Sequence, residues 1–124
     1  MNFREFLKSN IVYLDGAMGT MLQDAGLKAG QYPERWNLLH PDIVQNIHKS
    51  YFDAGCNVVC TNTFGANCLK FSDEELEDML RASFALAKQA RQDSIGAQEK
   101  FIALDIGPTG KLLKPLGDLD FEDA

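Results

Sequence analysis

Basic residues are scarce in this sequence, and its apolar stretches are short. Lys and Arg number 12 against 18 Asp and Glu, which gives a formal net charge of −6. A nucleic acid or an anionic membrane needs clustered cations, so we expect neither as a partner. No apolar stretch approaches the roughly 20 residues of a membrane span, and residues 1–10 contain no signal-peptide core or cleavage site. We therefore expect a cytoplasmic protein.

Potential metal ligands are also few, because the chain has three Cys and two His. Cys56 and Cys60 lie on an expected strand, where a rise of about 3.3 Å per residue separates them by roughly 13 Å. Two thiolates at that separation share neither a zinc ion nor a disulfide. We interpret the cysteines as free thiols and predict no metal ligand in this chain. His40 is expected to flank the helix that follows it, and His48 to lie on the surface of that helix.

Several common catalytic signatures are missing. The stretch "GAMG" at 16–19 lacks the spacing of a dinucleotide-binding loop, and "GPTGK" at 107–111 lacks the spacing of a P-loop and its Ser or Thr. Tyr13 stands where an aspartyl-phosphate phosphatase would carry its nucleophile. Neither histidine is accompanied by a G-x-S-x-G nucleophile elbow.

An alternation of apolar and amphipathic segments is present instead. We expect loops over 27–40 and 108–124, strands over 10–15, 56–64 and 100–107, and helices over 17–26, 41–55 and 72–96. Within the second helix, the apolar stripe is Ile43, Ile47, Tyr51 and Ala54. Ser72 and Glu75 have the spacing of a capping box at the start of the third helix. Strands that alternate with helices indicate an α/β domain with a parallel sheet.

Polar residues stand at the expected carboxyl end of each strand. Asp15 and Gly16 end the first, Asn62 and Thr63 end the second, and Asp105 lies near the end of the third. In parallel α/β folds, the carboxyl ends of the strands lie on one side of the sheet, where ligands bind. The sequence therefore predicts one pocket formed from these three strand ends.

Three segments together resemble the homocysteine S-methyltransferase family. They are "LDGAMGTML" at 14–22, "NLLHPDIVQNIHKSYFDAGCNVVCTNTFGAN" at 37–67 and "ALDIGPTGKLL" at 103–113. The similarity extends from about Asn10 to Ala124, and it is greatest to the homocysteine-binding module of cobalamin-dependent methionine synthases. It implies a TIM (β/α)8 barrel, which needs roughly 250 residues. We therefore expect residues 1–124 to form a partial homocysteine-binding domain of about three β/α units, truncated after the third strand.

The resemblance also implies the chemistry of the complete enzyme. In this family a zinc ion held by three cysteines binds the homocysteine thiolate, which takes a methyl group and becomes methionine. The similarity implies methylcobalamin, loaded from methyltetrahydrofolate, as the donor, and hence folate and cobalamin modules on a longer polypeptide or a separate chain. The family's Cys-Cys pair after glycines is missing here. We therefore expect zinc and cobalamin only in the complete enzyme, no catalytic residue in this chain, and no activity from it alone.

By the same resemblance, Asp15, Gly16 and Ala17 bind homocysteine. The Asp15 carboxylate would accept hydrogen bonds from the substrate ammonium group. The backbone N–H groups of Gly16 and Ala17 would contact the substrate carboxylate, since glycine allows a close approach. Asp15 could instead cap the helix that follows it.

The other two strand ends supply the remaining walls of the predicted site. Asn62 and Thr63 would make polar contacts that shape the pocket, and Asp105 and Gly107 would form its third wall. Hydrogen bonds within the loops are the alternative role for Asn62, Thr63 and Asp105.

Three alternatives remain open at this stage. One is a cobalamin-independent homocysteine methyltransferase that uses betaine or S-methylmethionine as donor. Another is a non-catalytic half-barrel module that needs a second chain, and a third is an unrelated α/β domain. An isolated three-stranded sheet exposes unpaired strand edges, so we also expect the chain alone to be marginally stable or to associate.

Overall fold

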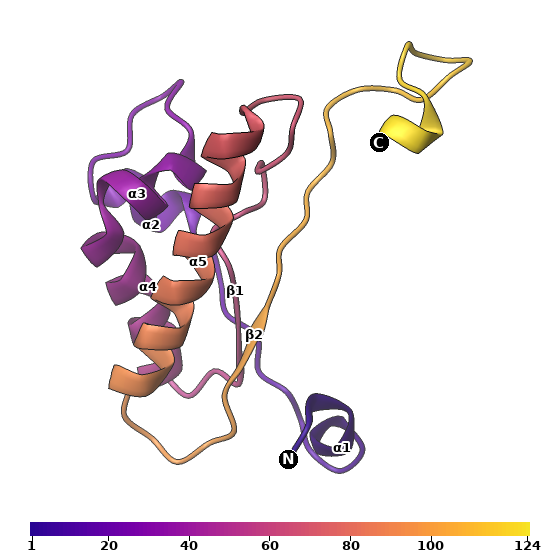
Figure 1. Ribbon diagram of the computed structural model, residues 1–124. Helices are drawn as coiled ribbons and strands as arrows, with labels where there is room; N and C mark the ends of the chain where they lie inside the picture. The colour runs from indigo at the N-terminus through magenta and orange to yellow at the C-terminus, as the bar shows by residue number, and fades with distance from the viewer.

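The computed structural model describes all residues, 1–124, as an α/β unit in which helices cover one side of a small sheet (Figure 1). The elements in chain order are α1 (Phe3–Leu7), α2 (Gly19–Asp24), the 3-10 helix η1 (Pro33–Arg35), α3 (Trp36–Leu39), α4 (Pro41–Asp53), β1 (Val58–Cys60), α5 (Asp73–Asp93), β2 (Phe101–Ala103) and the 3-10 helix η2 (Phe121–Asp123).

The sheet has two parallel strands, in which Val59 of β1 pairs with Ile102 of β2. The prediction of a strand at 10–15 is wrong. Within this segment only Leu14 is paired, through an isolated parallel bridge to Val58. The Tyr13 carbonyl accepts from the N–H groups of both Asn57 and Val58. Strand pairing between this segment and β1 does not extend beyond the Leu14–Val58 bridge. The expectation of about three β/α units is therefore corrected to two strands and one bridged residue.

The long helices α4 and α5 pack against each other on one side of the strands, whereas α1 lies near the strand starts (Figure 1). The ring of Phe3 in α1 meets that of Phe101 edge-on, with centroids 5.2 Å apart. Two groups of buried side chains form the core, the first among the helices and the second between α4, α5 and the sheet. They are Leu22, Leu27, Trp36, Val44 and Ile47 in the first group, and Phe52, Val59, Ala87 and Ala90 in the second.

Helix α4 begins at Pro41 as predicted, but its buried face is rotated from the expected one. The structure buries Val44, His48 and Phe52 together with Ile47, while Ala54 is exposed. The prediction that His48 lies on the surface is therefore wrong, since its side chain is fully buried. Helix α4 packs against α3, α5 and β1. Because it has neighbours on several sides, its buried face is wider than the single apolar stripe of a surface helix.

Helix α5 begins after Ser72, whose hydroxyl accepts from the Glu75 N–H at 3.2 Å. The reciprocal half of the predicted capping box is replaced by an ion pair, because Glu75 accepts from Arg35 Nε at 2.7 Å. The expected loop at 27–40 is wrong in part, since η1 and α3 form there. None of the helices is both long and apolar enough to cross a membrane.

Candidate functional site

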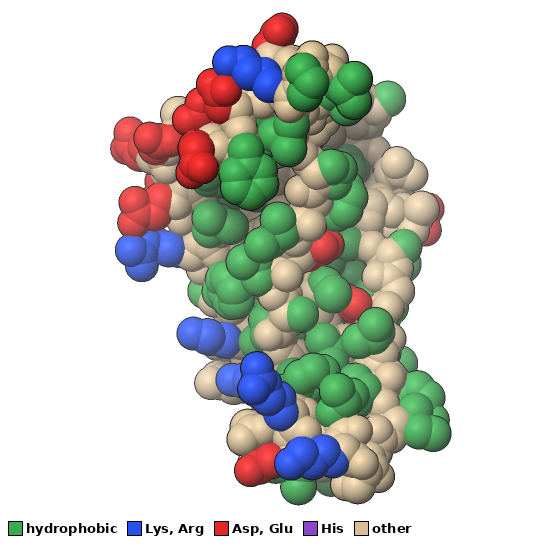
Figure 2. Space-filling view, turned by 90° about the vertical axis from the view of Figure 1, so that its right-hand side faces the viewer, with side chains coloured by type: hydrophobic (Ala, Val, Ile, Leu, Met, Phe, Trp, Pro, Cys, Tyr) green, Lys and Arg blue, Asp and Glu red, His purple; other side chains and the backbone are tan.

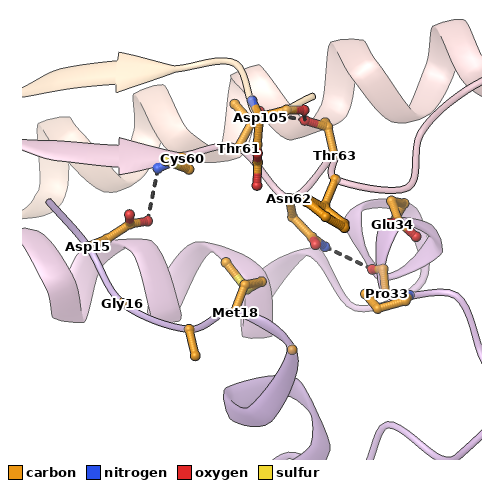
Figure 3. Close-up of a pocket in the computed structure, with 13 residues that line it drawn as sticks. Asp15, Gly16, Met18, Pro33, Glu34, Cys60, Thr61, Asn62, Thr63 and Asp105 are labelled. Carbon is orange, nitrogen blue, oxygen red and sulfur yellow. Dashed lines mark hydrogen bonds between the residues drawn. The ribbon is translucent and has the colours of Figure 1, made fainter. Parts of the chain in front are cut away.

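A pocket of about 370 Å³ lies where the carboxyl ends of β1 and β2 meet the segment after Leu14. Figure 3 shows the two strands ending above it and η1 closing one end. The lining residues are Asp15, Gly16, Ala17, Met18, Gly19, Pro33, Glu34, Cys60, Thr61, Asn62, Thr63, Phe64 and Asp105. The structure thus brings every sequence-predicted site residue except Gly107 into the lining of one pocket.

Asp15 connects the first wall of the pocket, formed by residues 15–19, to the end of β1. Its Oδ2 accepts from the Cys60 N–H at 2.9 Å, and its own N–H donates to the Val58 carbonyl at 2.9 Å. It does not cap α2, because the N-cap residue of that helix is Met18 and no side chain caps it. Burial raises the pKa of Asp15, the Cys60 N–H opposes that rise, and the nearby Asp105 adds to it.

Gly16 and Ala17 run past Tyr51 of α4. The Tyr51 hydroxyl donates to the Ala17 carbonyl at 2.6 Å, and a Cβ at Gly16 would lie 3.0 Å from the same hydroxyl oxygen. A larger residue at position 16 would have to displace the Tyr51 ring by a few tenths of an ångström. The backbone here is held by α4 and lines the pocket.

Asn62 and Thr63 are buried at the pocket wall, and hydrogen bonds within the chain engage their side chains. Asn62 Nδ2 donates to the Pro33 carbonyl at 2.8 Å, and Thr63 Oγ1 donates to the Asp105 carbonyl at 2.7 Å. Thr61 Oγ1 accepts from the Asp105 N–H at 3.2 Å. These contacts set the shape of the wall and tie the end of β1 to the segment after β2.

Asp105 and Gly107 lie on the segment that follows β2, but only Asp105 lines the pocket. The Gly107 N–H donates to the Phe64 carbonyl at 3.0 Å. Gly107 therefore contacts the site through Phe64, which is itself a lining residue.

Glu34 and Cys60 are lining residues that the sequence analysis did not select. Glu34 is 5% exposed, and its Oε1 accepts from the Gly65 N–H at 2.6 Å. No sequence pattern indicated this, because Glu34 lies in a segment expected to be a loop. The spacing of Cys60 from Cys56 argues only against a shared metal ion and does not indicate a position in the pocket wall.

Burial and the negative charge of Asp15 raise the pKa of the Cys60 thiol to about 11. The thiol is therefore protonated at neutral pH. No group of three or more His, Cys, Asp or Glu side chains in the structure could hold a metal ion. The residues of this chain do not fit the three-cysteine zinc site that the resemblance implies.

A family model described as homocysteine S-methyltransferase matches residues 12–124. The chain is 32% identical over 129 residues to a methionine synthase from Mycobacterium tuberculosis and 31% identical to one from Mycobacterium leprae. Each alignment covers 94% of this chain. The chain spans only 11% and 10% of the length of these two relatives.

Solved structures of the homocysteine methyltransferase MmuM from Escherichia coli share the fold. The metallated form matches with a TM-score of 0.73 at 23% identity, over 86% of this chain and 41% of that chain. The oxidised form matches with a TM-score of 0.74 at 24% identity. The two parallel strands and their helices correspond to part of that barrel. From the family match over nearly its whole length, this chain belongs to the homocysteine S-methyltransferase family.

Proposed function

We propose that this chain forms part of the homocysteine pocket of an S-methyltransferase, in which the homocysteine thiol accepts a methyl group to give methionine. One observation carries the proposal. In a chain of this family, residues from four separate segments line one pocket at the carboxyl ends of parallel strands. The thiol loses its proton, and the reaction then forms a sulfur–carbon bond and breaks the bond between the donor and the same methyl carbon.

We assign recognition of the ammonium and carboxylate groups of homocysteine to residues 15–17 in the first wall of the pocket. The Asp15 carboxylate accepts hydrogen bonds from the ammonium group, and the N–H groups of Gly16 and Ala17 contact the carboxylate. Asn62, Thr63 and Asp105 shape the opposite walls through their own hydrogen bonds, and Gly107 supports Phe64.

The metal and the methyl donor belong to the complete protein in this proposal. Zinc and cobalamin would be held by residues other than those of this chain, whose side chains form no metal site. The likeness to methionine synthases supports a cobalamin-bound methyl group, with folate and cobalamin modules as partners. Betaine and S-methylmethionine are the alternative donors, and an assay of the full-length enzyme with each donor separates them.

A non-catalytic module that pairs with a second chain is the second candidate. It is favoured by the lack of any metal-binding group among the residues of this chain. Methyl transfer by this chain alone would exclude it. A binding partner that supplies a Cys-Cys pair would support it.

Replacement of Asp15 tests the proposed pocket. We expect Asp15→Asn to weaken homocysteine binding about tenfold or more, because a charge-assisted hydrogen bond is worth about 1.5–3 kcal/mol. Asparagine keeps an oxygen that can accept from the Cys60 N–H, so the wall stays in place. Isothermal titration calorimetry measures the affinity, and Asp24→Asn, at the exposed end of α2, is the matched control. An Asp15→Asn chain that binds as tightly as wild type would remove Asp15 from the site.

A further inference from the structure

Glu34 is a buried carboxylate that no ion pair compensates. Its side chain lines the pocket and is 5% exposed, and none of the four ion pairs in the structure includes it. Removal of a carboxylate from water costs free energy unless hydrogen bonds replace its hydration. Glu34 must therefore be stabilised by the hydrogen bond that it accepts.

That hydrogen bond is matched to a glycine. Glu34 Oε1 accepts from the Gly65 N–H at 2.6 Å, and a Cβ at residue 65 would lie only 2.7 Å from the same oxygen. Gly65 does not have a positive φ, so it is not required for its backbone conformation. Its lack of a Cβ leaves room for the carboxylate, because a larger residue would displace Glu34 Oε1 from the N–H. Glu34 and Gly65 thus work as a pair.

Two further hydrogen bonds join the same two segments. We call residues 33–37 the η1 wall and residues 62–65 the β1 loop. Asn62 Nδ2 donates to the Pro33 carbonyl at 2.8 Å, and Asn37 Nδ2 donates to the Asn62 carbonyl at 2.8 Å. These bonds hold one end of the β1 loop, and the Glu34 carboxylate holds the other. Figure 3 shows Glu34 and Asp15 at opposite ends of the pocket, so the two carboxylates have separate places in it.

We infer that Glu34 is a positioning residue, which clamps the β1 loop through Gly65 and so fixes the wall formed by Asn62, Thr63 and Phe64. The inference rests on the proposed homocysteine pocket and adds a residue to it. A hydrogen bond to an ionised acceptor is roughly twice as strong as a neutral one, which suits a carboxylate to this task. Glu34 does not touch the ligand in this role.

The first test compares Glu34→Ala with Glu34→Gln in the full chain. Glutamine keeps an oxygen acceptor for the Gly65 N–H, whereas alanine removes it. We expect Gly65 amide hydrogen exchange, measured by NMR without ligand, to accelerate about tenfold or more in Glu34→Ala and much less in Glu34→Gln. Homocysteine affinity, measured by calorimetry, should fall in the same order. Glu77→Ala removes a glutamate that pairs with Arg81 within α5, away from the pocket, and it should leave both readouts unchanged.

A double-mutant cycle tests the pair. Gly65→Ala should weaken homocysteine binding in the wild-type background, because its Cβ displaces Glu34 Oε1. In the Glu34→Ala background the same change should add little, since the oxygen is gone and the other close atom is the flexible end of Lys70, 3.2 Å from the Cβ position. Additive losses would contradict the clamp.

Two results would overturn the inference. In the first, the Gly65 amide of Glu34→Ala exchanges at the wild-type rate, and the variant binds homocysteine with the wild-type affinity. In the second, Glu34→Gln binds as weakly as Glu34→Ala while its Gly65 exchange stays slow, which would mean that the carboxylate contacts the ligand directly. A full-length enzyme that binds no homocysteine refutes the proposed function instead, and Gly65 exchange alone then decides the clamp.

Discussion

His48 is the most unusual side chain in the core. It is fully buried in α4, and neither ring nitrogen has a hydrogen-bond partner. Burial alone lowers its pKa to about 4 from an ordinary value of 6.5. Because the buried imidazole resists protonation, acid favours the unfolded state, in which the ring is free to bind a proton.

We expect acid to destabilise the chain through His48. The unfolded state binds the proton at pH 6.5 and the folded state only at about 4, so the contribution of His48 to the free energy of unfolding falls as the pH drops through this window and is constant above it. The slope approaches about 1.4 kcal/mol per pH unit, which gives a loss of about 3 kcal/mol at pH 4. Urea denaturation followed by circular dichroism between pH 4 and 7 measures it.

The matched variants are His48→Leu and His40→Gln. Leucine removes both unpaired nitrogens, so its unfolding free energy should lose most of the pH dependence between 4 and 6.5 and should not fall much at pH 7. His40 is exposed at the start of α4, and the variant there should keep the wild-type slope. A His48→Leu chain with an unchanged slope would move the acid sensitivity to other groups.

At the scale of elements, α5 depends on the cap at its amino end. Ser72 Oγ satisfies the Glu75 N–H, and the first turn carries Asp73, Glu74 and Glu75, which interact favourably with the helix dipole.

We expect Ser72→Ala to lower the free energy of unfolding by about 1 kcal/mol, because one backbone N–H at the start of α5 loses its partner. Urea denaturation at pH 7 measures the change. Ser94→Ala, at the other end of the same helix, should cost less, since the Ser94 hydroxyl donates to the exposed Arg91 carbonyl, which water can satisfy instead. Equal losses at the two ends would show that the cap contributes nothing specific.

The helices were easier to predict from the sequence than the strands. Pro41 and Ser72 are local signals, and both helices begin at the residues that those signals indicate. The strand expected at 10–15 failed because a strand exists only through its partners, and Leu14 alone finds one. The pocket was predicted because polar residues at strand ends are visible locally. Glu34 was missed because its contact with Gly65 spans 31 residues of chain.

At the scale of the whole molecule, one face of the sheet remains open. β2 pairs only with β1, and Figure 2 shows apolar side chains gathered over this side of the chain. Leu14 is 63% exposed and Ile106 is 78% exposed. An unpaired parallel edge beside exposed apolar side chains favours association.

We expect the isolated chain to self-associate at micromolar concentration, as measured by sedimentation velocity. Ile106→Lys, next to the open strand, should shift the chain towards the monomer, because a charge on this surface opposes burial. Leu116→Lys is the matched control, since Leu116 is 85% exposed on the C-terminal segment that extends away from the sheet in Figure 1. A strictly monomeric wild-type chain would contradict the expectation.

The pocket is closed by hydrogen bonds between residues far apart in sequence, and this has a consequence for the order of folding. Asp15 and Cys60 are 45 positions apart, and Thr63 and Asp105 are 42. Each such closure must overcome the entropy of a long loop before its contacts repay the cost, whereas the turns of α4 and α5 form between near neighbours. We therefore expect the walls of the pocket to assemble after the helices, so that a newly made chain has its helical scaffold before it has a place for a ligand.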